Sequence, residues 1–197
     1  MRRASLGALL LTLLVLCTAC GSGGGSPPPR YDGSQLSPSA PAPDFTLVDQ
    51  AGRRVGLAAQ RGHYVIVTFL YTRCPDVCPV IAGNLNTALA TPAARQAGLR
   101  VLAVSVDPKG DTPAAVRAYV RSHRLLPAFR YLIGSPAALR RVWRTWHVAA
   151  LAGKQGTVTH TAIEFLIDPK GQEVLTYGSD VRSAWVVHDL KALQAAG

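Results

Sequence analysis

From residue 43 onward, short runs of hydrophobic residues alternate with segments in which apolar and polar positions mix. Residues 64–71 form one such run, which is continuous and rich in β-branched and aromatic side chains. This pattern is typical of a strand that is buried on both faces, as in a parallel sheet. Residues 99–106, 129–133 and 163–168 predict further strands.

The segments between these strands predict helices and turns. Thr112 supplies a hydroxyl cap and Pro113 suits a first turn, so we expect a helix to begin there. Other helices are expected over residues 77–90, 136–146 and 183–194, and short strands near residues 45–48, 55 and 173–177. Strands that alternate with helices, followed by a hairpin and a final helix, indicate an α/β sandwich.

The N-terminus predicts an export signal. Two arginines precede an apolar run over residues 6–16, and small residues then lead to Cys20. These small residues resemble the cleavage box of bacterial lipoproteins, in which the first mature residue is a lipid-modified cysteine, although Cys17 stands where a leucine is usual. We therefore expect residues 1–19 to be a lipoprotein-type signal peptide and Cys20 to carry the lipid. An ordinary cleaved signal and an uncleaved N-terminal transmembrane anchor are the alternatives.

Residues 20–42 are rich in glycine, serine and proline, which predicts a flexible linker. Residues 43–197 then form one folded domain, because a chain of 197 residues suits a single core. Either a lipid or a helix at the N-terminus would tether this domain to the extracytoplasmic face of the cell membrane. A tether raises the local concentration of the domain near a membrane-bound partner.

The chain carries 21 Lys and Arg against 11 Asp and Glu, a formal net charge of +10. The basic residues are scattered and form no nucleic-acid-binding motif, so we expect no nucleic acid partner. A docking surface for an acidic partner, or for the membrane, accounts better for the excess positive charge.

The predicted domain contains two cysteines, Cys74 and Cys78, directly after the buried strand at residues 64–71. They lie near the start of a helix, where the dipole favours a thiolate, and at a strand end, where functional sites of α/β folds collect. Positions i and i+4 of a helix share one face, about 5 to 6 Å apart. This spacing allows the pair to bind a soft metal ion such as Cu(I) or Zn(II), or to form a disulfide.

Three segments in order extend this pattern. They are YTRCPDVCP at residues 71–79, SVDP with DTP and a tyrosine at residues 105–119, and THT with LIDPKG at residues 159–171. Together they resemble the signatures of the Sco/SenC family of copper chaperones, over roughly residues 41–195. The resemblance implies a thioredoxin-like α/β/α sandwich with a central mixed sheet and an N-terminal β extension.

The resemblance also implies a function. Members of the family bind copper through two cysteines and one histidine, which correspond here to Cys74, Cys78 and His160. They serve assembly of the dinuclear copper centre of cytochrome c oxidase, so the implied partners are subunit II of that oxidase and a copper donor protein. Because thiols outside the cytoplasm tend to oxidise, we also expect a thiol reductase to keep the pair reduced.

Two carboxylates are candidates for contacts behind the ligands. Asp76 lies between the cysteines, and Asp107 follows a predicted strand, where it either shapes the site or caps a turn with Pro108. Thr159 stands where many family members have an aspartate, which leaves any supporting role of that position open.

A thiol–disulfide oxidoreductase or a peroxidase on the same fold is the alternative function. The cysteine pair could also form a disulfide with a purely structural role. Thioredoxin-type enzymes have two residues between their cysteines, whereas three separate Cys74 from Cys78. Peroxiredoxins place a threonine three residues before the reactive cysteine, where this chain has Tyr71. Neither enzyme requires His160, so the sequence favours a metallochaperone.

Overall fold

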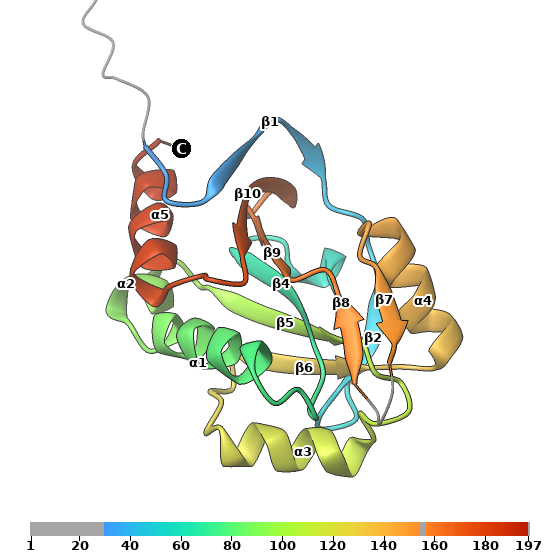
Figure 1. The fold of residues 1–197 in the computed structure, drawn as a ribbon. Coiled ribbons are helices and arrows are strands. Elements are labelled where there is room, and N and C mark those ends of the chain that lie inside the picture. Colours follow the sequence, from blue (N-terminus) through green and yellow to red (C-terminus); the bar gives the residue numbers. More distant parts are fainter. Residues whose placement is uncertain (1–29, 154–156, 197) are drawn as a thin grey trace, which may run out of the picture.

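The longest apolar runs of the sequence become paired strands in a computed structural model that describes residues 30–153 and 157–196. They form an eight-stranded sheet in the order β1-β10-β9-β4-β5-β6-β2-β3, while β7 and β8 form a separate two-stranded hairpin (Figure 1). The bounds are β1 Ser34–Pro41, β2 Thr46–Asp49, β3 Arg54–Gly56, β4 Val65–Leu70, β5 Arg100–Ser105, β6 Phe129–Ile133, β7 Ala150–Ala152, β8 Val158–His160, β9 Ile163–Ile167 and β10 Gln172–Gly178.

The sheet is mixed. β4 is parallel to β5 and β5 to β6, whereas β9 runs antiparallel to β4 and β10 antiparallel to β9. All six residues of β4 are buried, as expected of a central strand with helices on both faces. The predicted α/β sandwich with a mixed sheet is confirmed.

Five α-helices and a short 3₁₀ turn cover this sheet in the described part of the chain. They are η1 Ala58–Gln60, α1 Val77–Leu89, α2 Pro92–Gln96, α3 Pro113–Ser122, α4 Pro136–Thr145 and α5 Ser183–Ala196. α2, α3 and α4 each begin with a hydroxyl cap followed by proline: Thr91, Thr112 and Ser135 accept a backbone N–H at 3.2 Å. Such caps satisfy an otherwise free N–H group of the first turn.

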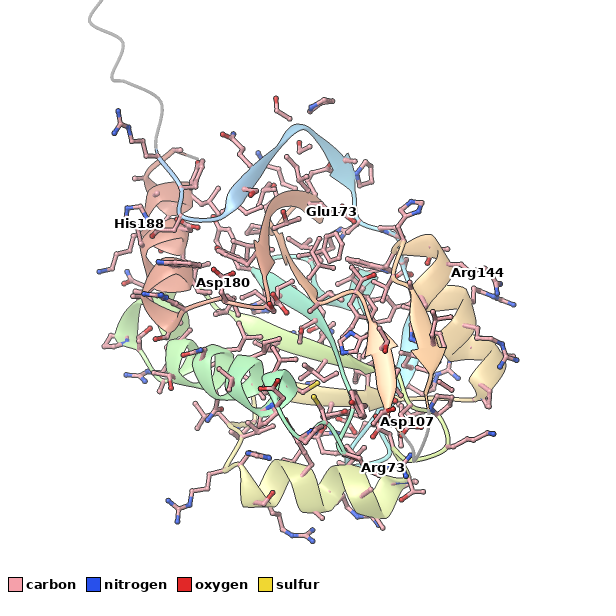
Figure 2. The ribbon with its side chains drawn as sticks, in the orientation of Figure 1. Arg73, Asp107, Arg144, Glu173, Asp180 and His188 are labelled. Carbon is pink, nitrogen blue, oxygen red and sulfur yellow. The ribbon has the colours of Figure 1, made fainter. Side chains whose placement is uncertain are left out.

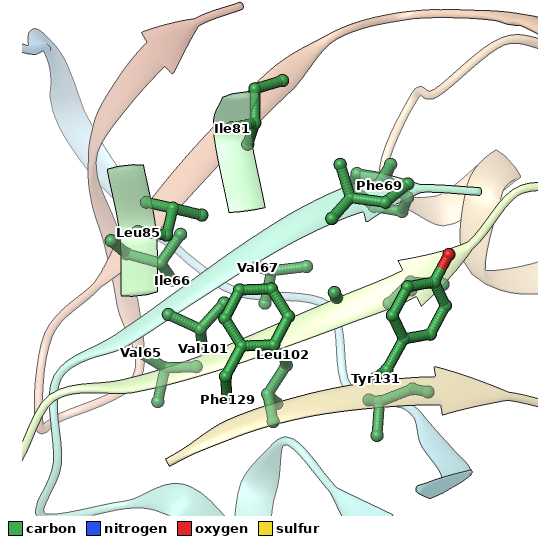
Figure 3. Packing of buried hydrophobic residues seen from close by; sticks show 14 of the residues in the cluster. Val65, Ile66, Val67, Phe69, Ile81, Leu85, Val101, Leu102, Phe129 and Tyr131 are labelled. Atoms are coloured by element: carbon green, nitrogen blue, oxygen red, sulfur yellow. The ribbon is translucent and has the colours of Figure 1, made fainter. Parts of the chain in front are cut away.

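The helices lie in two layers, one on each face of the sheet. The side chains of β4 point alternately to the two faces and contact both layers. Figure 3 shows Ile81 and Leu85 of α1 over the face of β4 that carries Ile66, and α5 packs beside α1. Phe69 points to the opposite face because successive strand residues alternate. There its ring lies 6.2 Å from that of Trp146, which directly follows α4. The core therefore has apolar layers on both faces of the sheet.

The N-terminal part of the fold differs from the prediction. The flexible linker was expected to extend to residue 42, but β1 pairs antiparallel with β10 at the edge of the sheet. The buried carboxylate of Asp189 in α5 also accepts the backbone N–H groups of Asp32 and Gly33, at 2.8 and 2.9 Å. Hydrogen bonds rather than apolar burial hold this segment, so its composition resembles that of a linker.

The predicted signal peptide and the lipidation site at Cys20 lie outside the described residues. Among residues 30–153 and 157–196, no helix is both long enough and apolar enough to cross a membrane.

Candidate metal site

The two cysteines lie where β4 passes into α1. Cys74 is in the connecting loop and half-buried, and Cys78, the second residue of α1, is fully buried. The backbone N–H of Cys78 points at the sulfur of Cys74, 3.4 Å away. Both thiols are free. Cys74 thus precedes the helix instead of sharing its face, and its sulfur lies over the first turn, where unpaired N–H groups favour negative charge.

His160 reaches this loop from the other end of the chain. It is the last residue of β8, and β7 holds that strand through the pairing of Ala150 with His160. Its Nε2 lies 3.9 Å from the sulfur of Cys78, and its Nδ1 lies 3.0 Å from the backbone carbonyl of Thr161. A proton on Nδ1 satisfies that carbonyl, which leaves the lone pair of Nε2 directed at the sulfur.

These atoms can share one metal ion. Metal–sulfur and metal–nitrogen bonds of about 2.3 and 2.0 Å, the lengths known for zinc, let one ion touch both atoms when these are less than about 4.3 Å apart. Burial lowers the pKa of His160, against the opposing effect of the Thr161 carbonyl. A neutral imidazole is the form that binds metals. The donor set of two sulfurs and one imidazole therefore fits a soft ion such as Cu(I), and the imidazole suits Cu(II) as well.

The two thiols differ in their tendency to ionise. Burial works against a Cys74 thiolate, but the Cys78 thiol and the backbone N–H groups of Asp76 and Cys78 point at its sulfur and lower its pKa. Burial raises the pKa of Cys78 strongly, and the neighbouring Cys74 raises it further. Without a metal, Cys74 is therefore the thiol of the pair that ionises first, and Cys78 donates a hydrogen bond to its sulfur.

Tyr71 connects the two halves of the site. Its ring meets the ring of His160 edge-on, with centroids 6.0 Å apart. Burial raises the pKa of its hydroxyl, which lies beside the backbone N–H of Val158 and the thiol of Cys74. One side chain of the cysteine segment thus packs against the hairpin that carries the histidine.

Two carboxylates fix the loop that carries Cys74. Asp107 binds the guanidinium of Arg73, with 2.6 Å between Oδ2 and Nη2, and the two residues lie together above α3 (Figure 2). Asp111 is buried and accepts both the backbone N–H and the hydroxyl of Thr72, at 2.9 and 2.7 Å. The hydroxyl groups of Ser105 and Tyr131 complete its hydrogen bonds.

The candidate carboxylates from the sequence therefore separate. Asp107 reaches the site indirectly, through Arg73, the residue before Cys74. The side chain of Asp76 is exposed and forms no capping hydrogen bond at the start of α1; only its backbone N–H faces the sulfur of Cys74. Thr159 is exposed on β8, paired with Leu151 of β7.

The site opens to the surface beside Cys74. A pocket of about 300 Å³ lies between residues 74–77 and residues 157–160, with Tyr71 and Ala162 in its wall. An incoming ligand can therefore reach Cys74 and His160, whereas Cys78 lies beneath them.

Sequence reasoning missed Tyr71 and Asp111 as parts of the site. Both lie inside the segments that carried the family resemblance, and this was the one signal that marked them. It missed the β7–β8 hairpin as well, because two strands of three residues leave no readable alternation.

The chain resembles known proteins over most of its length. Residues 34–195 match the family model described as SCO1/SenC. The mitochondrial SCO2 homologue of Bos taurus is 33% identical over 154 residues, which are 74% of this chain and 56% of the bovine protein. The chain thus spans little more than half of that relative.

Solved structures show the same fold. Apo Sco1 of Thermus thermophilus superposes with a TM-score of 0.72 at 34% identity, covering 83% of this chain and 97% of that one. ScoI of Bradyrhizobium japonicum, solved with copper bound, superposes with a TM-score of 0.67 at 32% identity, covering 77% and 98%.

Proposed function

Because the chain belongs to the SCO1/SenC family, we propose that it is a copper chaperone that binds Cu(I) or Cu(II) through Cys74, Cys78 and His160. The observation that carries this proposal is the 3.9 Å approach of Nε2 of His160 to the sulfur of Cys78. A structural disulfide or a redox pair needs no imidazole there, whereas a third copper ligand belongs there. The copper-bound ScoI structure of a relative at 32% identity supports the same ion.

The asymmetry of the site suits transfer of the ion. Cys78 is buried and His160 is held by a hairpin, whereas Cys74 borders the pocket that opens to the surface. A partner's ligand that enters this pocket displaces the accessible ligand first. A three-ligand site also leaves room for an incoming donor, so copper moves by stepwise ligand exchange without being released as a free ion.

The recipient that we propose is the dinuclear copper centre in subunit II of cytochrome c oxidase, during its assembly, with a separate protein as copper donor. A tether at the extracytoplasmic face of the cell membrane, through a lipid on Cys20 or through an uncleaved anchor, would place the domain beside that subunit. The chaperone itself needs no catalytic residue.

The site is also gated by oxidation. When an oxidant outside the cytoplasm accepts two electrons from the two thiols, a bond forms between the sulfurs of Cys74 and Cys78, their two protons pass to the solvent or the oxidant, and both thiolate ligands are lost. A thiol reductase must return the electrons before copper binds, because the compartment outside the cytoplasm favours disulfides.

The second candidate is a thiol–disulfide oxidoreductase that acts on exported proteins. The lowered pKa of Cys74 beside the raised pKa of Cys78 favours it, since attacking and resolving thiols differ in this way. His160 has no place in that chemistry. A secondary reductase activity toward the cysteines of the copper recipient is compatible with both candidates.

A transfer assay tests the proposal. The reduced full chain is loaded with copper and mixed with the apo form of the soluble copper domain of subunit II. We expect the absorption of the dinuclear centre to appear with the wild type, and to fail with Cys74→Ser, Cys78→Ser or His160→Ala. Equal transfer by wild type and His160→Ala, or full copper loading of the oxidised chain, would overturn it.

A further inference from the structure

The exposed side of α3 carries a row of arginines. Arg117 and Arg121 are one turn apart, and Arg124 lies two residues beyond the end of the helix. All three are exposed, and none forms an ion pair with another residue of the described chain. The helix thus presents cations that its own fold does not compensate.

The surrounding sequence has the same bias. No aspartate or glutamate occurs between Asp111 and Glu164, a stretch that contains all of α3 and α4. Solvent-exposed helices usually mix both signs of charge, because pairs at i and i+4 stabilise them by about 0.2–0.5 kcal/mol each. Two of the arginines lie near the C-terminal end of α3, where their positive charge interacts favourably with the helix dipole. That local effect does not account for the absence of carboxylates over the whole region.

α3 borders the copper site. Its inner side buries Tyr119, and burial together with the nearby thiols of Cys78 and Cys74 raises the pKa of that hydroxyl. The loop that enters α3 contains Asp107 and Asp111, the two carboxylates that fix the cysteine loop. The arginine row therefore lies on the exposed side of a helix whose buried side approaches the two cysteines.

We propose that Arg117, Arg121 and Arg124 of α3 dock an acidic surface of the protein that exchanges copper with this chain. The inference rests on the proposed function for the identity of that protein, whereas the location and the sign of the docking surface come from the charges of α3. Uncompensated cations beside an exchange site attract an acidic partner and orient it, at a rate that salt suppresses.

The position of α3 favours a protein over the membrane to which we propose the chain is tethered. The described chain begins beside the end of α5, at the upper left of Figure 1, whereas α3 lies at the bottom of the same view. A surface that met the tethering membrane would be expected near the start of the chain. α3 lies instead on the other side of the domain from that start.

The chain offers a matched control. Arg140, Arg141 and Arg144 form a second exposed trio on α4, also without an ion pair among the described residues. Figure 2 shows Arg144 on the outer side of that helix. Replacing either trio by glutamate changes the net charge equally. A general effect of charge would therefore appear in both variants, and a docking surface in one alone.

Binding of the full chain to the soluble copper domain of subunit II is measured by calorimetry at two salt concentrations. Charge reversal on α3 is expected to weaken binding at least about 10-fold at low salt, because close charge pairs dominate such encounters. Reversal on α4 is expected to change it less than about 3-fold, and copper binding stays unchanged in both. A triple Arg→Gln variant of α3 repeats the test in case the glutamate variant does not fold.

Two further probes separate the sources of any effect. Chemical shifts on adding a deca-glutamate peptide should concentrate on α3 and be absent from its charge-reversed variant. Equal losses from both trios, no loss from α3, or α3-dependent binding to phosphatidylglycerol vesicles alone would overturn the docking surface. Failure of the reduced chain to bind Cu(I) would instead overturn the proposed function, whatever the peptide shows.

Discussion

The sulfur of Cys78 lies 3.9 Å from Nε2 of His160, although 82 residues separate them in the sequence. The contact depends on two independent features: the loop of residues 71–76 connects the buried strand β4 to α1, and the β7–β8 hairpin brings His160 beside the start of that helix. Cys78 is held in place by α1, and His160 is held in place by the β7–β8 hairpin. The site is thus held in place before an ion arrives, which lowers the cost of ordering its ligands.

The two thiols should react at different rates. With iodoacetamide near neutral pH, Cys74 is expected to be alkylated at least about 10-fold faster than Cys78, because only a thiolate attacks and Cys78 is buried with a raised pKa. Mass spectrometry of peptides from the reduced chain gives both rates. Equal rates would contradict the assigned asymmetry.

The Cys78 thiol also supports the Cys74 thiolate as a donor. Cys78→Ala removes this donor and should raise the pKa of Cys74, so that the alkylation of Cys74 slows at neutral pH. Cys78→Ser keeps a hydroxyl donor and should retain most of the rate. Alkylation rates measured from about pH 5 to pH 10 distinguish a change in the pKa of Cys74 from a change in the access of the reagent to its sulfur. Identical profiles for the two variants would show that Cys78 does not act as a donor to Cys74.

Glu164 should make the protein less stable as the pH rises. It lies in β9, fully buried, with one carboxylate oxygen near the Thr68 hydroxyl and the other without a partner among the described residues. Burial raises its pKa from 4.5 to about 8. Between these values the unfolded chain has lost the proton that the folded chain keeps, so the free energy of unfolding falls with pH and levels off above about 8.

Glu164→Gln cannot ionise and should remove this part of the pH dependence, a few kcal/mol at most since one pKa unit is about 1.4 kcal/mol. Glu164→Leu should also relieve the unpaired oxygen and stabilise the fold at every pH. Urea unfolding at about pH 5 and about pH 8 measures both. If wild type and Glu164→Gln lose stability in parallel, Glu164 is not the group responsible.

Asp111→Asn should loosen the cysteine loop. The carboxylate accepts hydrogen bonds from Thr72, Ser105 and Tyr131, and an amide that is half donor cannot accept them all. We expect a loss of about 2–4 kcal/mol in the free energy of unfolding, together with weaker copper binding. Ser105→Ala removes one donor and should cost about 1 kcal/mol. An Asn variant as stable as wild type would show that the carboxylate does not fix the loop.

Much of the fold could be predicted from the sequence because buried strands and helices require apolar residues at regular positions. β4 is apolar at nearly every position since both of its faces are covered, and Thr112 with Pro113 marks the start of α3 as predicted. β1 was missed because most of its residues are exposed, so its ladder with β10 leaves no hydrophobic signal. Hydrogen-bonded pairing at a sheet edge is a tertiary fact that single-strand patterns do not contain.

The site shows the same limit. The cysteine pair and its helix start were visible locally, but the spacing alone left a disulfide and a metal site equally open. The roles of Tyr71 and Asp111 depend on contacts with β8 and with Thr72, and no spacing rule places them.

Copper titration of the reduced chain, compared between His160→Ala and His63→Ala, tests the central claim most directly. His63 lies before β4, at the opposite end of that strand from the cysteines, with its ring 2.7 Å from the guanidinium of Arg100, and serves as the matched control. Losing a ligand should weaken Cu(II) binding at least about 100-fold and abolish its visible absorption, since even partners behind the ligands are worth 10- to 100-fold. His63→Ala should match wild type. Unchanged copper affinity and spectrum in His160→Ala would contradict the three-ligand site.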